Sequence, residues 1–124
     1  MGRVALGPGR ARRVGTAVVV ACAALVLTAC GTTTTHRQIL AADIATGPGW
    51  RPDAVAVSRD DEVVLSVGNT TGKTHGFSVE GYGIKKEVDP GNPVDVKFRA
   101  RKAGTFKIYC QLHPTHQIAT LIVQ

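Results

Sequence analysis

From residue 51 to residue 124 the sequence consists of short apolar or alternating segments separated by turn-forming residues. Alternation is clearest where Val94, Val96 and Phe98 are interleaved with charged residues. This period of two predicts strands that are buried on one face. The predicted strands are 54–58, 63–67, 77–80, 94–99, 106–109 and 118–123. No segment here has the periodicity of an amphipathic helix, so we expect an all-β sandwich or barrel.

The first 30 residues differ in character and predict an export signal. Residues 1–13 contain four arginines and no acidic residue, and a 14-residue apolar stretch runs from Val14 to Leu27. That stretch is shorter than the about 20 residues that span a bilayer, and the layout is that of a cleaved signal peptide. The ending Leu-Thr-Ala-Cys at 27–30 resembles a bacterial lipobox. We therefore expect a lipoprotein signal peptide in 1–29 and lipidation of Cys30; an ordinary signal with a chance cysteine is the alternative.

Processing at this point changes the charge and the cysteine content. Removing residues 1–29 takes four of the 15 Lys and Arg and none of the nine Asp and Glu, so the formal charge falls from +6 to +2. This small charge gives little support to a nucleic-acid partner. Cys22 leaves with the signal and Cys30 carries the lipid, so Cys110 is the one free thiol expected in the mature chain.

Residues 30–50 begin with a threonine run and end in Gly-Pro-Gly-Trp. This composition predicts a lipidated N-terminus followed by a flexible tether. Within it, residues 38–45 have the pattern of either one helical turn or an edge strand. The folded domain is accordingly predicted to cover residues 51–124.

Candidate metal ligands gather near the C-terminus. Cys110, His113 and His116 lie within seven residues, between two predicted strands, and His75 lies just before another strand. One thiolate with two or three imidazoles, presented by loops at one end of a β-sandwich, suits a single copper ion. The same residues also suit a tetrahedral zinc ion with one cysteine and three histidines.

The segment 74–110 resembles the cupredoxin domain of cytochrome c oxidase subunit II and of nitrous oxide reductase. It shares a His-Gly-Phe strand at 75–77, a Pro-Gly turn at 90–91 and an Ala-Gly-x-Phe approach to the metal loop at 103–106. The resemblance implies a cupredoxin-like Greek-key β-sandwich with a copper site. Those dinuclear sites use two cysteines in Cys-x3-Cys-x3-His-x2-Met, whereas this loop has one, so a mononuclear site is expected.

The metal loop itself resembles the short Cys-x2-His-Pro-x-Met loop of amicyanins. The resemblance implies His75, Cys110 and His113 as equatorial ligands and puts His116 at the position of the axial methionine. An imidazole is a stronger axial ligand than a thioether, so a lower reduction potential is expected. The alternative is that His116 points to solvent, with Gln117 or nothing in the axial position.

These features together predict a copper lipoprotein that carries single electrons on the extracytoplasmic face of the cell membrane, with a redox partner from a respiratory system. A copper chaperone or buffer that supplies an oxidase is the alternative. An enzyme with an open coordination position is the third candidate, and the sequence favours a carrier over an enzyme.

Overall fold

The computed structural model describes residues 2, 7, 9, 15 and 31–124. The predicted signal peptide and the predicted lipidation site at Cys30 lie outside these residues, apart from the four isolated positions. Residues 31–124 form a sandwich of two β-sheets without a helix, as predicted. Among the described residues there is thus no helix of sufficient length and apolarity to cross a membrane.

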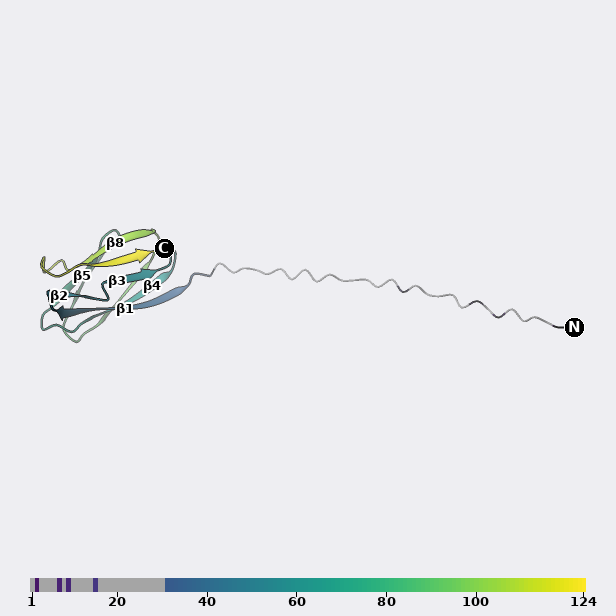
Figure 1. Cartoon of the computed structure of the whole chain (residues 1–124), viewed down its shortest axis with the longest axis horizontal. Coiled ribbons are helices and arrows are strands. Elements are labelled where there is room, and N and C mark those ends of the chain that lie inside the picture. The colour runs from purple at the N-terminus through teal and green to yellow at the C-terminus, as the bar shows by residue number, and fades with distance from the viewer. Residues whose placement is uncertain (1, 3–6, 8, 10–14, 16–30) are drawn as a thin grey trace.

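Nine strands build the two sheets in the described part of the chain (Figure 1). They are β1 (Thr34–Ile44), β2 (Gly47–Arg51), β3 (Ala54–Val57), β4 (Glu62–Asn69), β5 (His75–Val79), β6 (Ile84–Val88), β7 (Val94–Arg99), β8 (Gly104–Tyr109) and β9 (Ala119–Val123). One sheet has the order β2-β1-β4-β7 and the other the order β3-β9-β8-β5-β6. Both sheets are mixed, because β1 runs parallel to β4 and β3 runs parallel to β9.

The core lies between the sheets and draws large side chains from both. Its largest fully buried residues include Ile39, Trp50 and Leu65 from the first sheet and Phe77, Ile108 and Leu121 from the second. Trp50 meets Phe77 edge to face, with ring centroids 5.3 Å apart. Aromatic pairs prefer this arrangement, which contributes about 0.5–1.5 kcal/mol beyond the burial itself. The two sheets are therefore joined by specific packing as well as by apolar area.

The flexible tether predicted for residues 30–50 is wrong for most of that range. Residues 34–51 form β1 and β2, and β1 lies inside its sheet, between β2 and β4. Ile39 and Ala41 on β1 are fully buried, and Trp50 on β2 is only 1% exposed. The segment is structural because it contributes one wall of the core, so the folded domain begins well before residue 51.

The strand directions define two ends of the sandwich. Thr34 at the start of β1 pairs with Glu62, whereas Ala41 pairs with Asn69 at the close of β4. The C-terminus lies at the same end as the start of β1 (Figure 1). His75 and the segment after β8 lie at the other end, beyond the close of β4.

We predict that Ile39→Ala destabilises the protein by about 2–5 kcal/mol, because the change leaves a cavity in a packed core. Equilibrium urea unfolding of residues 31–124 measures this free energy. Gln38→Ala, at the exposed neighbouring position, is the matched control and should change stability by less than about 0.5 kcal/mol. Equal, near-zero effects of both changes would mean that this segment is a tether after all.

Candidate metal centre

Two strand ends bring the predicted ligands together. His75 is the first residue of β5, and Cys110 directly follows β8. These strands are antiparallel, with Ser78 opposite Tyr109 and Val79 opposite Ile108. Extending this register puts Cys110 beside the first residues of β5, although it is 35 positions from His75 in sequence. The loop from β8 to β9 then supplies His113 and His116.

Three of the four predicted ligands form a compact group. The ligand atoms of His75, Cys110 and His113 all lie within 4.8 Å of one another. The Cys110 sulfur is 3.9 Å from Nδ1 of His75 and 3.6 Å from Nδ1 of His113. His75 is 3% exposed and Cys110 5%, while His113 is half-buried. The group therefore opens to solvent on the side of His113.

The spacing of these atoms fits a small metal ion. A sulfur about 2.3 Å and a nitrogen about 2.0 Å from the same ion are separated by roughly 3.5–3.7 Å at angles of about 110–120°. The distance from the sulfur to His113, 3.6 Å, lies in this range, and the distance to His75, 3.9 Å, is slightly longer. One soft thiolate with two imidazoles is a donor set that suits copper and also zinc. The residues present thus fit a mononuclear site.

His116 lies beside this group rather than in it. Its side chain is 4% exposed, so the alternative in which it points to solvent is wrong. The His116 ring centroid is 4.7 Å from the ring of His75 and 4.7 Å from the ring of Trp50. Its Nδ1 lies 3.0 Å from the carbonyl oxygen of Gln117. A carbonyl only accepts, so Nδ1 carries the proton and Nε2 is left with a lone pair.

The Nε2 atom of His116 is buried and has no hydrogen-bond partner among the described residues. A buried polar atom without a partner costs about 1–3 kcal/mol. The folded chain therefore keeps a neutral imidazole, oriented by Gln117, next to the ring of His75, with one nitrogen free to accept a proton or bind a metal.

The first two strands support the site, which the sequence did not reveal. The backbone N–H of Gln117 donates to the carbonyl of Pro48 on β2, at 2.9 Å, and the Gln117 side chain donates to Thr46 in the turn before that strand. Trp50, on the same strand, packs against His116. The sequence signal that could have indicated this support is Trp50, because a tryptophan is highly buried on average and is unusual at the end of an exposed tether.

The surroundings of His75 and His116 favour the neutral form of the imidazole, which is the form that metals bind. Burial lowers the pKa of His75 below the ordinary 6.5, and His116 and His113 lower it further, partly opposed by Asp43. Burial also lowers the pKa of His116, against the opposing effect of its hydrogen bond to Gln117. Metal binding requires deprotonated ligands, so neither histidine has to lose a proton near neutral pH.

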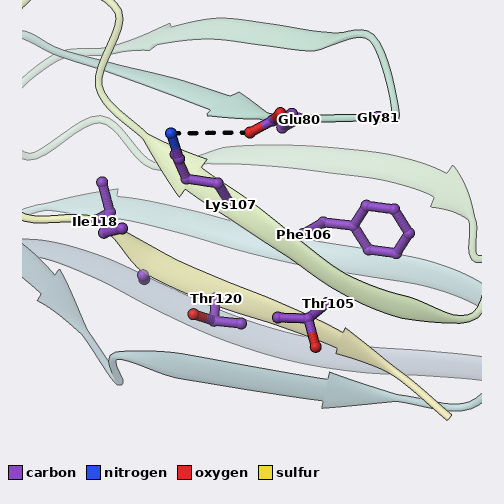
Figure 2. Close-up of a pocket in the computed structure, with 8 residues that line it drawn as sticks. Glu80, Gly81, Thr105, Phe106, Lys107, Ile118 and Thr120 are labelled. Atoms are coloured by element: carbon purple, nitrogen blue, oxygen red, sulfur yellow. Dashed lines mark ion pairs between the residues drawn. The ribbon is translucent and has the colours of Figure 1, made fainter.

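A separate open pocket lies on the five-stranded sheet, away from the ligand group. Figure 2 shows Lys107 of β8 reaching toward Glu80, with Nζ and Oε2 4.0 Å apart, beside Ile118 and Thr120 of the following segment. None of the four predicted ligands lines it. The pair is exposed, and an exposed ion pair contributes about 0–1 kcal/mol.

Comparison with known proteins connects this arrangement to a family. A family model described as a cupredoxin-like domain matches residues 17–123. The chain is 30% identical over 80 residues to cytochrome c oxidase subunit 2 from Thermus thermophilus, an alignment that covers 61% of this chain and 58% of that protein. A second cytochrome c oxidase subunit 2, from a named strain of Thermus thermophilus, is also 30% identical over 80 residues, covering 61% and 47%. The chain thus spans about half the length of these curated relatives.

Solved structures show the same fold at lower identity. A heme-copper terminal oxidase dimer matches with a TM-score of 0.63 and 16% identity, over 76% of this chain and 66% of that chain. Copper nitrite reductase from Nitrosomonas europaea matches with a TM-score of 0.62 and 17% identity, over 74% and 42%. At these identities the likeness concerns the fold alone, and it agrees with the predicted β-sandwich.

Proposed function

Because the chain belongs to the cupredoxin-like domain family, we propose that it binds one copper ion through His75, Cys110 and His113 and carries single electrons. The family also confirms the predicted fold class. The observation that carries the proposal is the convergence of a buried thiol with two imidazole Nδ1 atoms, 3.9 and 3.6 Å from its sulfur. A bound copper ion would supply one-electron redox chemistry at this position.

The protein's own contribution is to hold these donors in place. His75 and Cys110 extend directly from paired strands, so the sheet fixes their separation. The backbone N–H of Gly76 donates to the Cys110 sulfur at 3.1 Å, a bond that is stronger when the sulfur is a thiolate. Preorganised donors suit a carrier, because an electron carrier needs ligands that move little when the charge changes.

Exposure around His113 supports exchange of electrons with a partner. His113 is half-buried, whereas the other two donors are almost completely enclosed. Among the described residues, the exposed large hydrophobic side chains are Leu112 and Ile118, 42% and 58% exposed, both in or next to the same loop. Leu112 is the sequence neighbour of His113, and an exposed apolar residue next to a partly exposed ligand favours transient docking. The similarity to cytochrome c oxidase subunit 2 supports a respiratory partner.

Two other functions compete with electron transfer. A copper chaperone or buffer supplying an oxidase needs donors that exchange readily, and the chain contains a single methionine, Met1, to act as an open thioether ligand. A copper enzyme needs a coordination position open to a small molecule, and no observation on the described residues favours one. Zinc fits the same donors, but the family and the thiolate favour copper.

We further propose that the protein is a lipoprotein on the extracytoplasmic face of the cell membrane, attached through Cys30. The basic, apolar and Leu-Thr-Ala-Cys segments support this. Three residues separate Cys30 from β1, and an 11-residue strand extends about 36 Å at about 3.3 Å per residue. With the anchor at the start of β1, the ligand group would lie at the far end of the sandwich, accessible to a partner.

Titration of metal-free residues 31–124 with Cu(II) should saturate at one equivalent and produce a sulfur-to-copper charge-transfer band. Cys110→Ser should abolish that band, because the thiolate is its electron donor. Visible absorption and electron paramagnetic resonance measure both. His36→Gln, which removes an exposed imidazole on β1, is the control and should leave the band unchanged. Tight zinc binding with no copper-thiolate band in the unaltered protein would overturn the redox proposal.

We also propose His116 as the fourth ligand, through the Nε2 atom that has no other partner among the described residues. His116→Met should then raise the reduction potential, because a thioether is a weaker axial donor and favours the reduced ion. Voltammetry of the copper-loaded variants measures this, and His116→Gln gives the potential without either donor. An unchanged potential and spectrum in His116→Met would show that His116 is not a ligand.

Cys30→Ser should move the protein from the membrane fraction to the soluble fraction of a bacterial host, because the change removes the acylated thiol. Fractionation followed by immunoblotting measures the distribution. Cys22→Ser, eight residues earlier in the same segment, is the matched control and should leave the protein in the membrane. Retention of Cys30→Ser in the membrane fraction would argue against a lipid anchor at this position.

A further inference from the structure

Gln111, the residue after Cys110, has its side-chain amide fixed at both ends. Its Oε1 accepts a hydrogen bond from the hydroxyl of Ser78 on β5 at 2.7 Å. Its Nε2 donates to the carbonyl of Lys86 on β6 at 2.9 Å. The Lys86 carbonyl can only accept, which fixes the orientation of the amide. The side chain thus bridges β5 and β6 from the end of β8.

The bridging amide lies directly against the backbone of Gly76. A Cβ atom built on Gly76 would overlap Oε1 and Cδ of Gln111 and would lie 2.7 Å from its Nε2. All three of the nearest atoms belong to this one side chain. A β-carbon at residue 76 therefore requires the Gln111 amide to move, and moving it would break its hydrogen bonds with Ser78 and Lys86.

Gly76 is held on its other side by Cys110. Its backbone N–H donates to the Cys110 sulfur at 3.1 Å. Cys110 and Gln111 directly follow β8, and the Gln111 side chain turns instead to Ser78 and the Lys86 carbonyl. The buried thiol therefore holds Gly76 from within the sandwich and the amide holds it from outside. His75, the adjacent donor, is fixed by the same contact.

We propose that Gln111 is a positioning residue for the metal centre, acting through Gly76. Its amide clamps the first residues of β5 against the Cys110 segment and so sets the length of the Gly76 N–H to sulfur hydrogen bond. The inference rests on the proposed function only in assigning the sulfur to a metal; the clamp itself belongs to the chain. Hydrogen bonds to a ligating sulfur tune its donor strength and the potential of the site.

Loss of the clamp has two expected effects. In Gln111→Ala the Gly76 N–H is free to move away from the sulfur, which becomes a stronger donor, so the charge-transfer band should move to longer wavelength and the potential should fall. Mutation of a residue that orients a metal ligand typically lowers the metal affinity about 10–100-fold. We expect a loss of Cu(II) affinity in that range. Ser78→Ala, which removes one of the two bonds and keeps the glutamine, should shift the band in the same direction by less.

The decisive experiment combines Gln111→Ala with Gly76→Ala in a double-mutant cycle. Alone, Gly76→Ala forces a methyl group into the amide and should lower the thermal midpoint and disturb the band. In the Gln111→Ala background the methyl group has room, so the second change should cost much less. Such coupling is the expected signature of residues in direct contact. Equal damage by Gly76→Ala in both backgrounds would overturn the inference.

A measurement without metal separates this inference from the proposed function. The rate at which a small disulfide reagent modifies Cys110 should rise in metal-free Gln111→Ala, because the thiol is less firmly enclosed, even at temperatures where the fold is intact. A copper-thiolate band in the unaltered protein, with neither band nor thiol reactivity changed in Gln111→Ala, overturns the positioning role. No band in the unaltered protein overturns the proposed function instead, and thiol reactivity then still decides whether Gln111 positions Cys110.

Discussion

The hydrogen bond from the Gly76 backbone N–H to the Cys110 sulfur is the contact on which the candidate site depends. It joins residues 34 positions apart at 3.1 Å and exists because Ser78 on β5 pairs with Tyr109 on β8. A slip of one residue in this register would turn Cys110 to the other face of the sheet. Ile108 is fully buried on the same face as Cys110, and Phe77 is fully buried on the same face as His75. Core packing therefore sets the register, and the register brings the donors together.

The strands that could be predicted are those with one face on the core and one in solvent, because their apolar and polar residues alternate. Val94, Val96 and Phe98 alternate because β7 covers one face of the core. β6 was missed because it lies at the edge of its sheet and only Val88 is buried in it. The sequence of β1 predicts a tether because its first half is polar; β2 pairs only with residues 40–44, so this half lies beside β4 alone. Its threonines favour strands, but the partner that stabilises them is far away in sequence.

The site residues that could be predicted are likewise those that lie close together in sequence. Cys110, His113 and His116 lie in one loop, so their spacing alone indicated a metal site. His75 lies just before a predicted strand, which makes it a weak candidate alone; the family resemblance assigns it as a ligand, because nothing near it in sequence shows that β5 and β8 are neighbours. The support from Pro48 and Trp50 was not foreseen, since these residues reach the loop only through the pairing of β1 and β2. Contacts between distant strands are what a local pattern does not contain.

The contacts that bury His116 leave one of its ring nitrogens without a hydrogen-bond partner among the described residues. Trp50 and His75 pack against its ring, and the Gln117 carbonyl accepts a hydrogen bond from Nδ1–H. Burial favours the neutral imidazole, against the opposing effect of the hydrogen bond to Gln117, and Nε2 is left with a lone pair and no donor among the described residues. A stable core would more readily place an apolar side chain there, because an unpartnered buried nitrogen costs about 1–3 kcal/mol. A bound metal ion would offset that cost, and this supports the proposal that His116 is the fourth ligand.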